Sequence, residues 1–237
     1  AEEIQNFANW FSYSRTRINI MKTGAGRAFS DLGDNFRVGF ITINPVVSGS
    51  SVSTSRYLPL AKFDAAQRLA WYTKFYAQGT PGGTPLPQAL SRVGRHYAGM
   101  TDGINSGMNE DPIEFSCQQN FALLTTDGFW NSGGGVNITG ASVGNQDNVE
   151  DTGLVKYVSR ASGTFDGNVS GASNTLADVA MYYYKTDLRT PLQKPNNTAG
   201  IAVNANDVPK TDIDFATHQH MTTFTLGLGV TGNMTYR

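Results

Sequence analysis

Apolar or small side chains recur every three or four residues over positions 4–28, which is the spacing of one helix face. The members of this stripe are Ile4, Phe7, Phe11, Ser14, Ile18, Met21, Ala25 and Ala28. The basic side chains fall outside the stripe; they are Arg15, Arg17, Lys22 and Arg27. The pattern predicts one helix of about 25 residues, longer than the average of ~12. Small residues at its end allow close approach to a sheet, so we expect the helix to lie against a sheet throughout.

Further along the chain, continuous apolar runs alternate with helical patterns. Buried strands are predicted at 36–43, 58–63, 121–125 and 222–230. Helices are predicted at 65–78, with Asp64 as N-cap, from Leu86 onward, and at 175–186, with Asn174 as N-cap. The inward positions of the middle helix are Leu86, Ala89, Leu90, Val93 and Tyr97. Strands that alternate with helices imply a mostly parallel sheet covered by helices on both faces.

Two long polar tracts interrupt this alternation, at 128–173 and 187–217. The first is rich in Gly, Asn and Ser, and the second contains prolines. Uninterrupted loops of such length are uncommon in compact domains. We therefore interpret residues 1–237 as a single α/β domain with two loop insertions.

Composition narrows the class of protein. A chain of 237 residues suits one large α/β domain, and 39% hydrophobic residues suffice for its core. Charged residues make up 16%, below the typical ~25%, and glycine and small polar residues replace them, as in extracellular loops. A net charge of −1 without a Lys/Arg stripe argues against nucleic acid as a partner. No apolar run reaches the ~18 residues of a membrane span, and the polar start, AEEIQNF, is not a signal peptide.

Two residues stand where ligands collect in α/β proteins, at the carboxyl ends of parallel strands. Thr84 lies in the turn-dense loop 79–86 that enters a helix, and Asp127 directly follows the strand at 121–125. Mg²⁺ takes oxygen ligands, keeps several waters and needs few carboxylates. A hydroxyl and a carboxylate from neighbouring loops would serve such a cation. The alternative is that both residues only shape turns.

Other motifs lack the context that their chemistry requires. The pattern G-x-G-x-x-G at 227–232 has no predicted helix after it to hold a phosphate. Ser142 lies in G-x-S-x-G at 140–144, but no apolar strand precedes it, which argues against an esterase. His218 and His220 would share one face if the strand predicted at 222–230 extends back to them, but no third or fourth zinc ligand stands at a telling spacing, so we expect satisfied strand-edge histidines.

The single cysteine and four glycosylation sequons leave alternatives open. A single cysteine is most often a small core residue, and we expect this of Cys117. The alternative is half of a disulfide whose partner lies outside this chain. The sequons begin at Asn137, Asn168, Asn196 and Asn233, and chance explains them in an Asn- and Thr-rich chain.

Longer motifs resemble a known family. Gly-Gly-Thr-Pro-Leu before a helix, and Leu-Leu-Thr-Thr-Asp-Gly closing a strand, resemble the second and third metal-site motifs of von Willebrand A-type domains. Several strings resemble, more narrowly, the PilY family of type IV pilus assembly and tip-adhesin proteins. These strings lie at 6–11, 117–131, 144–147, 174–189 and 219–230.

The resemblance implies a von Willebrand A-like (Rossmann-type) fold, with a β-propeller domain beyond this chain. It also implies a first metal motif, Asp-x-Ser-x-Ser, upstream of the first helix, and a last strand and helix after Val230; neither is present. We therefore expect an incomplete domain without its first and last core strands. Thr84 and Asp127 remain as metal ligands by analogy, for Mg²⁺ or Ca²⁺ in the complete protein; two ligands alone should bind such an ion weakly or not at all in this fragment.

Three functional hypotheses follow. The first is a non-catalytic adhesion and assembly module at the tip of a bacterial type IV pilus, secreted through the periplasm. Its partners would be minor pilins or the tip complex, and a host or abiotic surface ligand bound through the metal site. The second is a force-bearing or pilin-docking domain with a vestigial metal site. The third, a hydrolase, has the least support.

Overall fold

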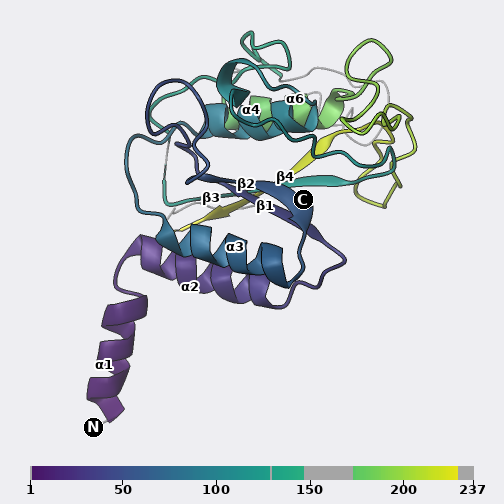
Figure 1. Cartoon of the computed structure of the whole chain (residues 1–237). Helices are drawn as coiled ribbons and strands as arrows, with labels where there is room; N and C mark the ends of the chain where they lie inside the picture. The colour runs from purple at the N-terminus through teal and green to yellow at the C-terminus, as the bar shows by residue number, and fades with distance from the viewer. Residues whose placement is uncertain (1, 129, 147–172, 229–237) are drawn as a thin grey trace.

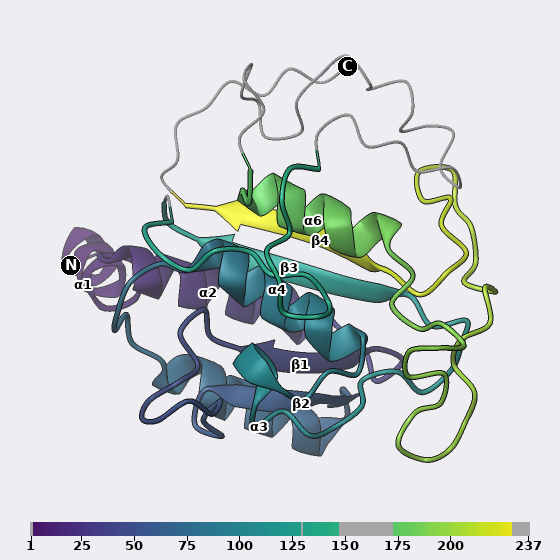
Figure 2. The same cartoon turned by 90° about the horizontal axis from the view of Figure 1, so that it is seen from above.

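The chain folds into three layers, in which strands lie between two pairs of helices (Figure 1). The computed structural model describes residues 2–128, 130–146 and 173–228. On one side lie α2 (Arg17–Ser30) and α3 (Ala65–Ala77), and on the other α4 (Leu86–Tyr97) and α6 (Leu176–Lys185). Seen from above, the strands follow one another as β4, β3, β1 and β2 (Figure 2). The prediction of an α/β fold is confirmed; α3 packs on β1 and β2, and α4 and α6 pack on β3 and β4.

The N-terminal segment forms two helices, α1 (Glu2–Tyr13) and α2, so the predicted single helix is wrong. Thr16 takes an extended conformation and its hydroxyl accepts a hydrogen bond from the Asn19 amide, which caps α2. Ser and Thr favour such caps over helix interiors, and this explains the break. No residue of α1 is buried, and α1 points away from the layers, so it does not lie against a sheet.

Strands β1 (Arg37–Ile41) and β2 (Tyr57–Lys62) pair antiparallel, which corrects the expectation of a mostly parallel sheet. The connection at 42–56 contains no helix, and a parallel return would need a crossover, usually a helix. Trp71 of α3 covers this pair of strands, with its ring 6.3 Å from that of Phe40. The same Trp71 stacks on Phe29 of α2 at 4.5 Å, so α2 is held through α3.

Strands β3 (Asn120–Thr126) and β4 (Met221–Gly227) pair parallel, from Asn120 opposite Met221 to Thr126 opposite Gly227. Helix α6 supplies the crossover between them. One face of this pair packs under α4 and α6, where Leu90, Val179 and Tyr183 belong to the main core. Of the predicted inward positions of α4, all but the half-buried Val93 are buried.

The predicted helix starts are nearly right. Asp64 caps α3 as expected, with bonds from two backbone amides. The N-cap of α6 is Thr175, not Asn174, and it forms a reciprocal capping box with Asp178. Asn174 instead adopts φ 63° and accepts a hydrogen bond from the Gly144 amide, which ties α6 to the first polar tract.

The second polar tract, 187–217, has no helix or strand of its own, yet it packs onto the domain. Leu188 and Val203 are fully buried in the main core. Arg189 is also fully buried, with its guanidinium bonded to both carboxylate oxygens of Asp111 at 3.0 and 2.5 Å. Most of the first tract, 147–172, lies outside the described residues. Within the described part of the chain, no helix is long and apolar enough to cross a bilayer.

Candidate functional site

The loop that carries Thr84 contacts the segment after β3 through Asn131. Asp127 directly follows β3 at its carboxyl end, and Thr84 lies two residues before α4. The Thr84 amide donates to Oδ1 of Asn131 at 2.8 Å, and the Asn131 amide donates to the Thr84 carbonyl at 3.2 Å. This reciprocal pair fixes the loop after β3 against the loop that enters α4. A cation shared by Thr84 and Asp127 stays a prediction.

Asp127 faces a cationic side chain of this chain. Nη1 of Arg17, at the start of α2, lies 3.2 Å from Oδ2 of Asp127. The two side chains are 64% and 56% exposed, and exposed pairs contribute at most about 1 kcal/mol. The Arg17 guanidinium therefore binds this carboxylate only weakly. A divalent cation could take its place beside Asp127.

A third loop, after β1, borders the same region. Nδ2 of Asn44 donates a short hydrogen bond to the Gly83 carbonyl, next to Thr84. Gly82 has φ 88° and packs on the Asn44 side chain, so a residue with a Cβ would be strained there. Asn44 thus holds the Thr84 loop from one side, and Asn131 holds it from the other.

The donor set suits a hard cation but is incomplete. It consists of one hydroxyl, one carboxylate and two side-chain amides, and such oxygen ligands are those of Mg²⁺ or Ca²⁺. Oδ1 of Asn131 already accepts bonds from Thr84 and Ser132. Among the described residues, no group of three or more His, Cys, Asp or Glu side chains could hold a metal ion. Further oxygen ligands would have to come from outside these residues.

Sequence reasoning missed Arg17, Asn44 and Asn131, which organise this region. Arg17 belongs to a stretch that the helical pattern assigned to one continuous helix. The two asparagines stand in loops that follow strands, where side-chain amides often hold turns. Their position in loops that follow predicted strands is the one signal in the sequence that could have indicated Asn44 and Asn131.

The other candidate motifs take structural roles. Ser142 lies in a turn opposite Val136 and donates a short hydrogen bond to Asn174, with no strand-to-helix elbow around it. Gly227 ends β4, and the rest of the motif at 227–232 lies almost entirely outside the described residues. The sequons at Asn168 and Asn233 also lie outside them.

The two histidines are held by the second polar tract and α6. Nε2 of His220 lies 3.1 Å from Oδ2 of Asp214, and His218 contacts the Tyr184 carbonyl at 3.1 Å. Burial opposes ionisation of Asp214, but hydrogen bonds from His220 and Tyr184 outweigh it and lower the pKa of this carboxyl. This arrangement agrees with satisfied histidines at the edge of a strand.

Cys117 is exposed, so its interpretation as a core residue is wrong. It lies three residues before β3, outside the buried part of the strand. The alternative, a disulfide to a partner outside this chain, stays a prediction.

Known proteins identify the family. The chain is 35% identical over 99% of its length to the type IV pilus biogenesis factor PilY1 of Pseudomonas aeruginosa strain PAK. It is 33% identical over 97% of its length to the protein of the same name from strain UCBPP-PA14. The chain spans 20% and 19% of these two relatives. No protein-family model and no solved structure matches it. The resemblance expected from the motifs is confirmed: this chain is a PilY-family sequence that corresponds to about one fifth of those relatives.

Proposed function

We propose that this chain is a non-catalytic assembly and adhesion module of a bacterial type IV pilus, exposed at the pilus tip. The observation that carries the proposal is the match along nearly the whole chain to proteins named as pilus biogenesis factors. Its partners would be minor pilins or the tip complex, and a host or abiotic surface ligand. A propeller domain outside this chain would belong to the same protein.

The fold we propose is a von Willebrand A-like domain whose sheet is completed by strands from outside this chain. The strands run β4, β3, β1, β2 in one layer (Figure 2), yet in the described residues β3 pairs only with β4 and β1 only with β2. Neither β1 nor β3 pairs with a second described strand, so a strand from outside this chain could lie between them. Such a strand would join the two pairs into one sheet.

The ligand site we propose is the region of Thr84 and Asp127. A divalent cation, Mg²⁺ or Ca²⁺, would supply a positive charge to which a carboxylate of the ligand binds. Thr84 and Asp127 would contribute oxygen atoms to it, and Asn44 and Asn131 would hold the Thr84 loop. The meeting of the two loops through Asn131 supports this reading.

Adhesion by a bacterium that carries variants of the complete protein tests the site. Asp127→Ala should reduce attachment while the level of surface pili stays normal, and EDTA should reduce attachment of the wild type equally. Asp34→Ala is the matched control, because Asp34 also forms an exposed ion pair, with Lys62. Attachment that neither EDTA nor Asp127→Ala lowers would remove the metal from the proposal.

The second candidate is a force-bearing or pilin-docking domain with a vestigial metal site. The Arg17–Asp127 pair favours it, since Asp127, the only carboxylate of the set, already has a cationic partner within the chain, although this exposed pair is weak. Normal attachment of Asp127→Ala, with lost piliation on deletion of the whole domain, would support this candidate. A hydrolase has no support from the surroundings of Ser142.

A further inference from the structure

One face of the β3–β4 pair is apolar, and the described residues leave its large side chains about half exposed. Paired residues of neighbouring strands share a face of the sheet, and side chains alternate along each strand. The register therefore gathers four apolar side chains opposite α4 and α6: Phe121, Leu123, Phe224 and Leu226. Each is about half exposed, from 45% for Leu226 to 52% for Phe224. The other two positions on this face are threonines, so the face carries no charge. We call it the bare sheet face.

Helix α1 carries a second apolar surface, which the described residues leave largely exposed except where the Arg15 guanidinium lies 4.2 Å from the centre of the Phe11 ring. Its members are Ile4, Phe7, Trp10 and Phe11, and their exposed fractions run from 47% to 76%. The Phe7 ring lies 5.8 Å from that of Trp10 and 6.1 Å from that of Phe11, so the side chains form a continuous stripe. The charged residues of the helix, Glu2 and Glu3, are confined to its first turn.

The two surfaces match in size. A helix of 12 residues is about 18 Å long, and strands of 7 residues are about 23 Å long. An amphipathic helix that lies along a sheet buries its stripe against the apolar side chains of that sheet.

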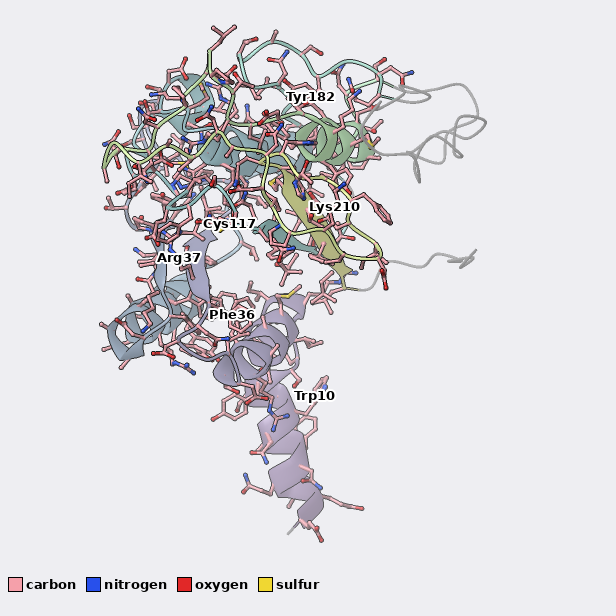
Figure 3. All side chains as sticks on the ribbon, turned by 90° about the vertical axis from the view of Figure 1, so that its right-hand side faces the viewer. Trp10, Phe36, Arg37, Cys117, Tyr182 and Lys210 are labelled. Carbon is pink, nitrogen blue, oxygen red and sulfur yellow. The ribbon has the colours of Figure 1, made fainter. Side chains whose placement is uncertain are left out.

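Helix α1 does not reach the bare sheet face of its own chain. Two hydrogen bonds fasten its last turn to α2: Asn19 Nδ2 donates to the Ser12 carbonyl at 3.3 Å, and Thr23 Oγ1 donates to the Tyr13 carbonyl at 3.1 Å. Held in this way, α1 extends away from the layers, with Trp10 far from the sheet (Figure 3). The same direction presents its stripe to another molecule.

We propose that two copies of this chain form a symmetric dimer in which α1 of each copy lies on the bare sheet face of the other. The contact is isologous, since each copy gives one helix and one face. At about 200 Å² for a large side chain, full cover of the exposed parts of these eight residues removes about 850 Å² per copy from water. A stable interface needs about 800 Å² per partner. A dimer in which α1 packs only on α1 of the second copy would bury about half of this area. The reciprocal contact, with α1 of each copy on the bare sheet face of the other, covers both apolar surfaces.

Sedimentation velocity over a wide range of concentration tests the dimer, with the purified chain and three variants. Phe7→Asp alters the helix stripe and Phe224→Asp alters the bare sheet face; each should weaken dimerisation at least tenfold, because a charge would be buried in an apolar contact. Leu192→Asp is the control, since Leu192 is fully exposed outside both surfaces. Circular dichroism checks that each variant folds, and Phe7→Asp lies on a helix without buried residues.

Mixing the variants distinguishes exchange from other dimers. An equimolar mixture of Phe7→Asp and Phe224→Asp keeps one intact helix–face contact, so it should form more dimer than either variant alone. In a Cys117→Ser background, Phe7→Cys mixed with Phe224→Cys should give a disulfide between the two positions under mild oxidation. A monomer at all concentrations would overturn the proposal, whether the face is then open or covered by another part of the protein. A dimer that Phe224→Asp leaves unchanged would also overturn it, because that result indicates pairing of α1 with α1.

Discussion

Gly94 allows the close packing of α4 on α6, and its replacement by alanine should destabilise the domain. A Cβ at position 94 would lie 2.3 to 2.5 Å from three ring atoms of Tyr183. Tyr183 is fully buried, and its hydroxyl donates to the Val136 carbonyl at 2.7 Å, so the ring cannot swing aside without breaking that bond. The two helices would have to move apart.

Two effects of opposite sign determine how much Gly94→Ala changes the free energy of unfolding. Alanine is favoured over glycine inside a helix by about 1 kcal/mol. Overpacking a well-packed core costs about 1–3 kcal/mol, and more when backbone must shift. Because the clash involves the ring rather than the end of a flexible chain, we expect the second effect to exceed the first. Gly94→Ala should lower the free energy of unfolding by about 1–2 kcal/mol.

Urea denaturation followed by circular dichroism measures this change. Gly24→Ala is the matched control, since Gly24 is also inside a helix and a Cβ there would meet nothing within 4 Å. It should raise the free energy of unfolding by up to about 1 kcal/mol. If Gly94→Ala were as stable as Gly24→Ala, α4 and α6 would not pack as closely as described, and the reasoning would fail.

Three further predictions concern buried and capping side chains. Burial lowers the pKa of His96 from 6.5 to about 4, so between these pH values only the unfolded chain binds a proton on this side chain. The free energy of unfolding should therefore fall by up to about 3 kcal/mol as the pH drops from 6.5 to 4. His96→Gln should flatten this part of the pH dependence, measured by urea melts at a series of pH values. Arg189→Leu leaves the buried carboxylate of Asp111 without its cationic partner, and it should lower the free energy of unfolding by about 3–5 kcal/mol in urea melts. The double variant that also carries Asp111→Leu should recover most of this loss. Thr16→Ala removes the bond to the Asn19 amide and should lower stability by about 1 kcal/mol, with a loss of helical circular dichroism.

The strands and most helices were predictable because their signals are local. Phe121 to Thr125 is a short apolar run between polar segments, and the observed strand extends it by one residue at each end. Asp64 has the side chain that an N-cap requires, and α3 begins directly after it. The break at Thr16 was hidden because the apolar stripe keeps its spacing from α1 into α2. Periodicity alone does not detect such a break.

Pairing between strands was not predictable from the same signals. An apolar run looks alike in parallel and antiparallel neighbours, so β1 and β2 were assigned to a parallel sheet. The candidate site shows the same limit. Thr84 and Asp127 were found from their positions at a helix entry and a strand end, whereas Arg17 approaches Asp127 from 110 positions away in the sequence. Contacts of that range follow from tertiary packing, which one sequence without its fold does not reveal.

The apolar pattern of β3 and β4 is informative where sequence and structure disagree. Strand β3 carries apolar side chains on both faces, with Phe121 and Leu123 on one and Ala122 and Leu124 on the other, a pattern typical of a strand covered on each side. The described residues bury one face and leave the large apolar side chains of the other about half exposed. The uncovered side chains expose about 400 Å² of apolar surface at about 200 Å² for each large residue. At about 25 cal/mol per Å², removing this surface from water has a gross value of about 10 kcal/mol, of which the entropy cost of association offsets a large part when the cover is a second molecule. An apolar surface of this size indicates that the bare sheet face is covered in the functional protein. Helix α1 of a second copy has the length and the apolar area to cover it.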